Sequence, residues 1–252
     1  MKNKINYLSI KMFLGRIAAT TLLILISPLL LLVALLIKLE SKGPAIYSSK
    51  RVGQNYKIFD LLKFRTMLLD ADKQTDVMKN LNQYSSPSFL ADKSTDECPF
   101  CKILKRPCSP ILHNDEGEIC ENLFILRKEK SAAFYKIKND PRVTKLGRFL
   151  RMTSIDELPQ LINVIRGDMS IIGNRPLPLY EAEKLTSDSA IARFNSPAGL
   201  TGLWQVTKRG KADVSETERI ELDKEYSRTF SFKTDLKILL KTIPALFQKE
   251  NV

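Results

Sequence analysis

The longest apolar segment of the chain lies near its N-terminus. It runs for 21 residues from Ile17 to Ile37, with only Thr20, Thr21 and Ser27 as polar interruptions. About 20 consecutive apolar residues are needed to cross the hydrocarbon core of a bilayer. A secretory signal peptide has a shorter apolar region, of about 7–15 residues, followed by a small-residue cleavage site, and no such site follows this run. The run therefore predicts a membrane-embedded helix.

Basic residues flank this apolar run on both sides. They are Lys2, Lys4, Lys11 and Arg16 before it and Lys38, Lys42, Lys50 and Arg51 after it. Because cytoplasmic segments are enriched in lysine and arginine, both flanks are expected on the cytoplasmic side. A helix that is kinked at Ser27-Pro28 and returns to the same face would satisfy both, although proline is also common in ordinary spanning helices. Charge and proline alone leave the re-entrant and the spanning arrangement open.

Shorter patterns predict the elements that follow. Residues 43–67 predict a β-hairpin, with strands at Ala45–Tyr47 and Lys57–Phe64 joined by a turn at 52–55. Apolar residues recur at helical spacing at 145–152, 158–166, 215–229 and 235–248. The last of these segments is basic and amphipathic, so it either lies on a membrane surface or packs against the core.

The stretch between the hairpin and the first of these helices, at about 70–138, is polar and has no sustained periodicity. We interpret it as an insertion. Chain length and pattern then predict a helix-rich α+β fold, in which an N-terminal membrane anchor at 1–42 precedes one domain at 43–252 that carries the insertion.

The charge of the chain points to an anionic partner. Lysine and arginine outnumber aspartate and glutamate by 40 to 28, which gives a formal net charge of +12. Such an excess is typical of proteins that bind nucleic acid, anionic lipid or phosphorylated small molecules, and charge alone does not choose among them. The only histidine is His113. Acid–base or nucleophilic chemistry elsewhere in the chain must therefore use carboxylates, hydroxyls or lysine.

All the cysteines fall within the insertion. They are Cys98, Cys101, Cys108 and Cys120, with His113 among them. This clustering is not the framework of a secreted disulfide protein and fits a reducing compartment. Four of these five side chains could surround a zinc ion tetrahedrally, which would order a segment that has little apolar content. Free thiols in a loosely ordered loop are the alternative.

A pair of adjacent acids, Asp156 and Glu157, precedes the helical pattern at 158–166. Ser154 and Glu157 have the spacing of a capping box, so both acids could simply complement a helix N-terminus. Pro159 argues against a regular first turn, because its ring would clash with the carbonyl of Ile155. We therefore expect the pair in a distorted first turn.

The acid pair has cationic neighbours in the sequence. Arg142, Lys145, Arg148 and Arg151 precede it at intervals of about three residues, and Arg175 follows it. A stripe of this kind is usually a solvated helix face. Arginines that converge on an ionised acid pair could instead hold phosphate oxygens and keep a carboxylate available as a nucleophile toward phosphorus.

Ordered motifs along the chain resemble those of one protein family. They are Gly43-Pro44-x-x-Tyr47, Arg51-Val52-Gly53, Lys63-Phe64-Arg65-Thr66-Met67, Asp140-Pro141-Arg142-x-Thr144, Gly147-Arg148-x-Leu150-Arg151, Thr153 to Leu161, Gly167-Asp168-Met169-Ser170, Arg175-Pro176-Leu177 and Gly199-x-Thr201-Gly202-x-x-Gln205-Val206. In this order they resemble the monotopic bacterial sugar transferases, the phosphoglycosyl transferases that start glycan assembly on undecaprenyl phosphate. The likeness covers most of residues 10–248 apart from the insertion.

This resemblance implies a ping-pong reaction. In that family the first acid of the pair attacks the β-phosphate of a UDP-sugar, releases UMP, and leaves an aspartyl phospho-sugar that the polyprenyl phosphate then attacks. Carried over, Asp156 is the nucleophile and Glu157 assists it through Mg²⁺. The basic positions that engage phosphates match Lys63, Arg151, Arg175 and, at a slightly different spacing, Arg209.

The resemblance also implies a location and partners. It favours the re-entrant form of the anchor, since Ser27-Pro28 matches the family's Ser-Pro break, and a catalytic domain on the cytoplasmic face of the bacterial inner membrane. The implied partners are the UDP-sugar, the polyprenyl phosphate and membrane lipid, with a homodimer as a further candidate and no nucleic acid. The pathway would be the first membrane step of exopolysaccharide, O-antigen, capsule or glycoprotein glycan assembly. Asn174 departs from the family, which has proline there, as does Ser49, where glutamine is common.

Two other functions remain open to the sequence. A membrane-tethered, non-catalytic module could use the basic surface to hold nucleic acid, although the chain has no recognised reader motif. A glycosyltransferase that releases UDP instead of UMP would differ only in the bond that breaks.

Overall fold

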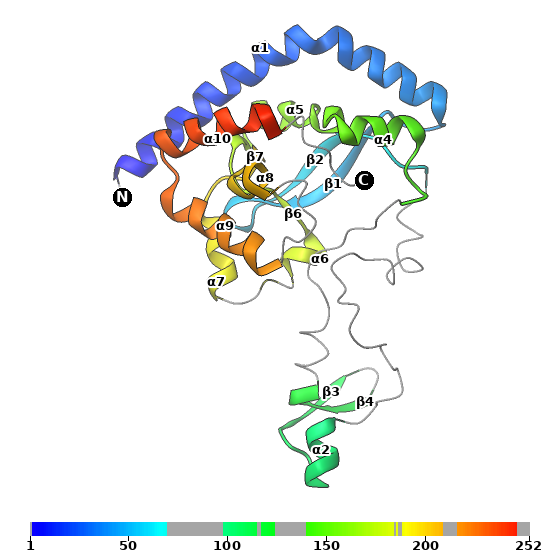
Figure 1. The fold of residues 1–252 in the computed structure, drawn as a ribbon, viewed down its shortest axis with the longest axis vertical. Coiled ribbons are helices and arrows are strands. Elements are labelled where there is room, and N and C mark those ends of the chain that lie inside the picture. Colours follow the sequence, from blue (N-terminus) through cyan, green and yellow to red (C-terminus); the bar gives the residue numbers. More distant parts are fainter. Residues whose placement is uncertain are drawn as a thin grey trace.

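The computed structural model describes residues 2–69, 98–114, 117–123, 140–183, 185, 188–208 and 216–245. The fold is helix-rich, and its longest element, α1 (Lys2–Glu40), arches over the rest of the domain (Figure 1). The segment Tyr7–Glu40 has a mean hydropathy of 2.8, so by length and composition it is able to cross a membrane.

Helix α1 is bent because Pro28 interrupts its hydrogen-bond ladder. Proline has no N–H, so the carbonyl of Ile24 loses its usual partner four residues ahead. The hydroxyl of Ser27 donates to that carbonyl at 2.8 Å. The Ser-Pro pair therefore bends the helix without leaving an unsatisfied oxygen.

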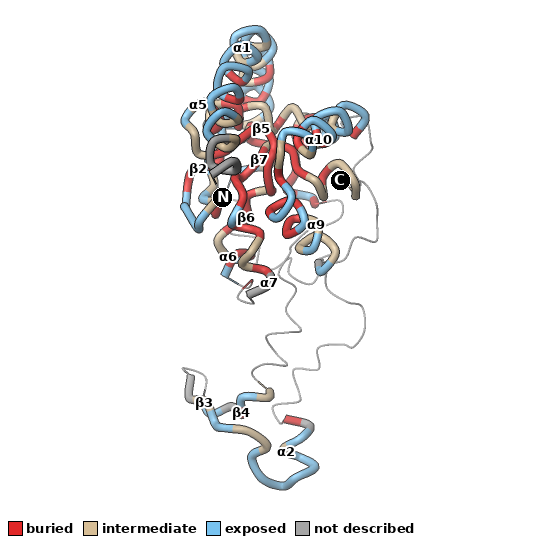
Figure 2. Tube along the Cα trace, turned by 90° about the vertical axis from the view of Figure 1, so that its left-hand side faces the viewer, coloured by how far each residue is buried: buried red, intermediate tan, exposed pale blue. Residues whose placement is uncertain are grey.

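The two faces of α1 differ sharply. Its concave face enters the core of the domain through Ala19, Val33 and Ile37, which are buried. Leucines on the other face are exposed, and Leu25 and Leu31 have exposed fractions of 76% and 72%. Figure 2 shows this contrast along the arch. An exposed apolar face of this extent is typical of a surface that contacts lipid or another apolar partner.

Strands form the centre of the domain below α1. Strand β1 (Ile46–Val52) pairs antiparallel with β2 (Ile58–Phe64), which places Tyr47 opposite Lys63, and pairs on its other edge with β6 (Leu177–Pro178). The turn between β1 and β2 contains a 3-10 helix, η1 (Gln54–Tyr56). Strands β5 (Ser170–Ile172) and β7 (Gly199–Thr201) form a short parallel pair.

Helices surround these strands. On the α1 side lie α4 (Lys145–Met152), η4 (Ile155–Glu157), α5 (Gln160–Arg166) and α10 (Phe232–Ala245), and elsewhere lie α6 (Leu179–Ala182), α7 (Asp188–Ile191), η5 (Ala192–Asn195), α8 (Leu203–Lys208) and α9 (Glu216–Thr229). Ile238 of α10 is buried while Leu240 and Ile243 are exposed. The C-terminal helix thus packs on the core with one face, which confirms one of its two predicted alternatives, and it presents an apolar face to the outside. Its contact with a membrane surface stays a prediction.

The sequence-based elements are confirmed where their patterns were strong. The hairpin and the four helical segments are all present, and α4 has the predicted bounds. The prediction for the first strand was too short, because the polar residues Ser48 and Lys50 lie on an exposed face of β1. Although the insertion shows no sustained periodicity, its cysteine-containing part holds α2 (Pro99–Leu104), β3 (Ile111–Asn114) and β4 (Gly117–Cys120). Elements of four to six residues are too short to show a periodicity.

Both ends of α1 are tied to the same domain. Near the N-terminus, Asp235 of α10 accepts a hydrogen bond from Tyr7 at 2.6 Å and forms an ion pair with Lys11 at 2.7 Å. At the other end, Glu40 accepts from the backbone N–H of Leu146 on α4 at 3.0 Å. The arch therefore starts and finishes on one side of the domain (Figure 1).

Candidate active site

The acid pair lies in a distorted turn between α4 and α5. Asp156 and Glu157 belong to the 3-10 turn η4, and Pro159 caps the start of α5. Ser154 has a φ of 58°, a left-handed conformation that non-glycine residues rarely adopt, and its side chain does not cap the turn. The capping-box interpretation is therefore wrong, and the expectation of a distorted first turn is confirmed. Strained backbone of this kind is common at functional sites.

Two cations hold Glu157 in place. The Nζ of Lys63, on β2, and the Nη2 of Arg175, which follows β5, both lie 2.9 Å from its Oε1. Burial raises the pKa of Glu157, but the charges and hydrogen bonds of Arg175 and Lys63 outweigh burial and keep this pKa well below its ordinary value. Glu157 is thus ionised at any physiological pH and fixed in orientation.

Asp156 is in a different state from its neighbour. It is buried, and burial raises its pKa to about 6, with the charge of Glu157 adding to the rise and those of Lys63, Arg151 and Arg175 opposing it. The nearby cations therefore keep the pKa of Glu157 low, but they only partly offset the effect of burial on the pKa of Asp156. Asp156 is an ionised but poorly solvated carboxylate at neutral pH, which is the state of an effective nucleophile.

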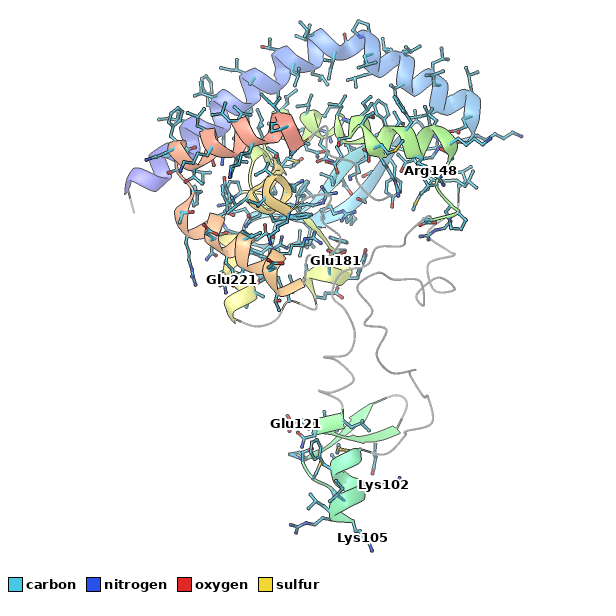
Figure 3. The ribbon with its side chains drawn as sticks, in the orientation of Figure 1. Lys102, Lys105, Glu121, Arg148, Glu181 and Glu221 are labelled. Carbon is cyan, nitrogen blue, oxygen red and sulfur yellow. The ribbon has the colours of Figure 1, made fainter. Side chains whose placement is uncertain are left out.

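The basic stripe before the acids separates into different roles. Arg151 donates from Nε to the hydroxyl of Thr66 at 3.0 Å. Its positive charge also acts to lower the pKa of Asp156. Arg142 is instead buried in a forked ion pair with Asp140, at 2.6 Å between Nη2 and Oδ2. Lys145 and Arg148 are exposed on α4 (Figure 3). Of this stripe, Arg151 is the member that the structure brings to the acid pair.

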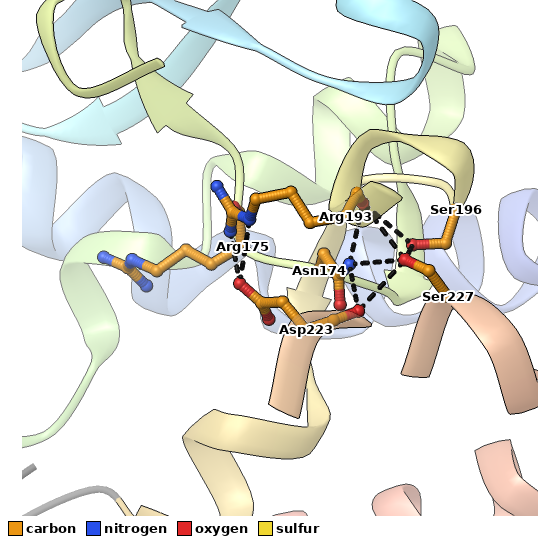
Figure 4. A network of polar contacts seen from close by, with 6 residues as sticks. All are labelled: Asn174, Arg175, Arg193, Ser196, Asp223 and Ser227. Carbon is orange, nitrogen blue, oxygen red and sulfur yellow. Dashed lines mark hydrogen bonds and ion pairs between the residues drawn. The ribbon is translucent and has the colours of Figure 1, made fainter. Parts of the chain in front are cut away.

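The loop that carries Arg175 is anchored from below by a buried polar network (Figure 4). The amide of Asn174 donates to the carbonyls of Arg193 and Asp223 at 2.8 and 2.9 Å and to the hydroxyl of Ser227 at 3.0 Å. The guanidinium of Arg193 donates to the carbonyl of Arg175 at 3.2 Å. The departure from proline at 174 is therefore compensated by direct hydrogen bonds that fix the loop.

Glycines allow this loop to run close to its neighbour. A Cβ on Gly199 would stand 2.0 Å from the backbone nitrogen of Gly173, and one on Gly173 would stand 2.3 Å from the carbonyl oxygen of Pro197. Only glycine fits two backbones that approach so closely. Gly173 and Gly199 thus allow the segment just before Arg175 to lie against residues 197–199.

Sequence reasoning missed several charged residues around this loop. Arg193 and Asp223 form an ion pair in which both side chains are 1% exposed. Arg51 lies near Arg175 and Glu181, and burial followed by the charge of Arg175 lowers its pKa. Burial raises the pKa of Glu181, on α6 (Figure 3), although nearby arginines oppose the rise. Arg51 stands in one of the family motifs, so the sequence could have identified it as a site residue. Arg193, Asp223 and Glu181 could not be identified from local spacing, because their partners are distant in sequence.

The remaining predicted site residues lie elsewhere. Arg209 falls outside the residues that the structure describes. The four cysteines come together around α2 and the β3–β4 hairpin, and they are not part of the acid-pair site. His113 lies on β3, within a residue range whose backbone alone is described.

Comparison with known proteins identifies relatives along nearly the whole chain. The profile of the family described as "Bacterial sugar transferase" matches residues 6–249. The exopolysaccharide production protein ExoY of Rhizobium meliloti is 35% identical over 91% of this chain and 82% of its own length. The UDP-glucose:undecaprenyl-phosphate glucose-1-phosphate transferase of Caulobacter vibrioides is 34% identical over 96% of this chain and 71% of its own. The undecaprenyl-phosphate galactose phosphotransferase of Salmonella typhimurium is 34% identical over 93% of this chain and 40% of its own.

The family profile spans most of α1, the hairpin and the acid pair. These matches confirm the resemblance drawn from the ordered motifs, and they make the non-catalytic, nucleic-acid-binding alternative wrong. The chain is an enzyme, and it belongs to the bacterial sugar transferase family.

Proposed function

We propose that this enzyme transfers a sugar-1-phosphate from a UDP-sugar to undecaprenyl phosphate, with Asp156 as the nucleophile and UMP as the leaving product. The names of the relatives supply the substrate classes, because two of them act on undecaprenyl phosphate and one on UDP-glucose. The observation that carries the role of Asp156 is its burial beside an acid that two cations hold ionised.

In the first step, a carboxylate oxygen of Asp156 attacks the β-phosphorus of the UDP-sugar. The bond between this phosphorus and the bridging oxygen of the diphosphate breaks, and the electron pair leaves on the phosphate of UMP. The product on the enzyme is an acyl phosphate, in which a carboxyl oxygen of Asp156 is bonded to the phosphorus of the sugar phosphate. Lys63, Arg151 and Arg175 surround the acids and stabilise the charge on the phosphate oxygens as that bond breaks.

In the second step, a phosphate oxygen of undecaprenyl phosphate attacks the same phosphorus. The bond between phosphorus and the oxygen of Asp156 breaks, which regenerates the carboxylate and forms the lipid diphosphate sugar. Because UMP has left, the two substrates use one phosphate-binding site in turn. The exposed apolar face of α1 brings this site to the lipid surface where undecaprenyl phosphate resides.

The acid pair also fits a Mg²⁺ ion. Glu157 is ionised, and since Lys63 and Arg175 both engage its Oε1, its Oε2 is the oxygen that would ligate the metal, with Asp156 as a neighbouring oxygen donor. When bound, Mg²⁺ would neutralise charge on the diphosphate and on the departing UMP.

For the anchor we propose the re-entrant arrangement, with the catalytic domain on the cytoplasmic face of the inner membrane. The support is that Tyr7 at one end of α1 and Glu40 at the other are bonded to the same domain. A straight helix of 39 residues would extend for roughly 58 Å and separate these two ends across the bilayer. With ExoY among the relatives, we propose exopolysaccharide assembly as the pathway.

The test of this function is product analysis with the purified, detergent-solubilised enzyme. It would be incubated with undecaprenyl phosphate, Mg²⁺ and each of a panel of UDP-sugars. Release of UMP together with a lipid diphosphate sugar is the expected result. Release of UDP would instead assign a glycosyltransferase, and no reaction with any UDP-sugar would contradict the proposed donor class.

The pKa of Asp156 predicts the pH dependence of this reaction. Its carboxylate must be ionised to attack, and burial has raised its pKa to about 6. We therefore expect kcat/KM for UMP release to be constant above pH 7 and to fall by about tenfold per pH unit well below pH 6. Glu157 stays ionised throughout, so it adds no second acid limb in this range. A rate that is unchanged from about pH 7 down to about pH 5 would contradict the assignment of Asp156.

The topology of α1 can be tested by labelling cysteines placed at Asn3 and at Lys42 in intact cells. We expect a membrane-impermeant reagent to reach neither position until the membrane is permeabilised, because both ends return to the cytoplasmic face. Pro28→Ala is the matched variant. It restores the N–H donor to the carbonyl of Ile24 and favours a straight helix, so one end should become accessible from outside. External labelling of either end in the unaltered anchor would show a spanning helix.

A further inference from the structure

Four thiols meet at one point in the inserted segment. The Sγ atom of Cys108 lies 3.6 Å from that of Cys98, 3.5 Å from that of Cys101 and 3.8 Å from that of Cys120. All four sulfur atoms lie within 4.8 Å of one another. The cysteines come from three places in the segment, since Cys98 caps the start of α2 and Cys101 lies in its first turn, Cys108 follows that helix, and Cys120 ends β4.

These spacings match the edges of a metal tetrahedron. Zinc binds thiolate sulfur at about 2.3 Å, so the edge of a regular tetrahedron of four such sulfurs is about 3.8 Å. The three distances to Cys108 are 3.5 to 3.8 Å. A disulfide would need its two sulfurs at about 2.0 Å, and a cluster of several iron atoms would hold the cysteines further apart. The spacing suits one ion at the centre.

Hydrogen-bond donors next to the thiols would stabilise the negative charge of thiolate sulfur. The backbone N–H of Cys108 donates to the Sγ of Cys101 at 3.4 Å, and the side-chain amide of Asn122 donates to the Sγ of Cys108 at 3.4 Å. Bonds of this kind orient ligands and stabilise thiolate charge in metal sites.

The described part of this segment has few buried apolar side chains that could stabilise it. Among its described side chains, Cys98 and Cys120 are the buried ones, and the large apolar side chains Phe100, Ile103 and Leu104 are at least half exposed. A unit of about 26 residues without an apolar core is too small to be stable unless a metal or disulfide links it. Cysteine side chains therefore form the buried interior of the part of this segment that the structure describes.

We propose that Cys98, Cys101, Cys108 and Cys120 bind one zinc ion as a closed structural site. Four thiolates complete a tetrahedral shell, so the site has no open position for water or substrate and His113 is not a ligand. Zinc binding supplies the free energy that folds α2 and the β3–β4 hairpin together. This site is independent of phosphoryl transfer at Asp156.

The test compares single variants of the full-length enzyme, purified in detergent without added metal. Metal content would be measured by mass spectrometry, and affinity by competition with a zinc-binding dye. About one zinc per chain is expected in the unaltered protein. Cys120→Ser should weaken zinc binding by about tenfold or more, as should Cys98→Ser. His113→Ala is the matched control and should retain the full zinc content and affinity.

A second measurement keeps the proposal falsifiable if a variant folds poorly. In the unaltered enzyme, alkylation followed by intact-mass analysis should leave all four thiols unmodified until a strong chelator is added, after which all four should react. Replacement of zinc by cobalt should give the intense visible absorption of a tetrahedral thiolate site. Absence of zinc with immediate alkylation, two disulfides in the isolated protein, stoichiometric iron, or loss of zinc in His113→Ala would each overturn the assignment.

Discussion

Asp156→Asn should lower the rate of UMP release by more than about 10³-fold and abolish covalent labelling of the enzyme. The amide has the same shape as the carboxylate but cannot attack phosphorus. Wild-type enzyme given a UDP-sugar without lipid acceptor should release about one UMP per chain and gain the mass of a sugar phosphate. The variant should do neither. Its stability should not fall, because burial disfavours the charge that the substitution removes.

Asp60→Asn is the matched control for this experiment. Asp60 lies on β2 with a side chain that is 56% exposed, and the side chain of its partner Lys50 is 65% exposed. An exposed pair of this kind contributes little to stability, so the control should behave as the wild type. If Asp156→Asn retains both the burst of UMP and the mass gain, the nucleophile is another residue.

Asp223→Asn should lower the free energy of unfolding by about 3–5 kcal/mol. Both side chains of the Arg193–Asp223 pair are excluded from solvent, so the substitution leaves the guanidinium buried without a counter-charge. Many proteins are stable by only about 5–15 kcal/mol, so the loss should be evident in the denaturant midpoint of the solubilised enzyme. Turnover should fall as well, because Arg193 also donates to the carbonyl of Arg175.

Two comparisons separate stability from positioning in this network. Glu225→Gln changes an exposed acid on the same helix, α9, and should leave the midpoint unchanged. The double variant Arg193→Met/Asp223→Leu removes both buried charges and should recover most of the lost stability. It should not recover turnover, since nothing then holds the loop of Arg175 from this side. A midpoint for Asp223→Asn equal to that of the wild type would contradict a structural role for the pair.

The sequence was informative where a short stretch of chain determines its own conformation. The pattern at 145–152 predicted α4, and the pattern at 158–166 predicted the end of α5, where Gly167 follows with a φ of 83°. The distorted turn at Asp156 followed from Pro159, whose ring is incompatible with a regular first turn. Each of these conclusions depends on interactions within about one helical turn, which is the range over which residue spacing carries information.

The site itself depends on contacts over much longer distances. Lys63 reaches Glu157 across 94 positions, and Arg193 meets Asp223 across 30. Motif resemblance identified Lys63 and Arg175, but no spacing rule shows that they share one oxygen of Glu157. The different ionisation of the two acids also escaped prediction, because burial of Asp156 is a property of the folded chain.

The bonds that tie the anchor to the domain have a consequence for the order of folding. Tyr7 and Asp235 are 228 positions apart, and Lys11 and Tyr226 are 215 apart, so these contacts join the first helix to the last two. During synthesis α1 is made well before its partners on α9 and α10. Contacts between such distant segments also form slowly, because closing a long loop costs entropy before any contact is gained. Helix α1 is therefore synthesised long before Lys11 can pair with Asp235, and docking of α9 and α10 onto it is expected to be a late step of folding.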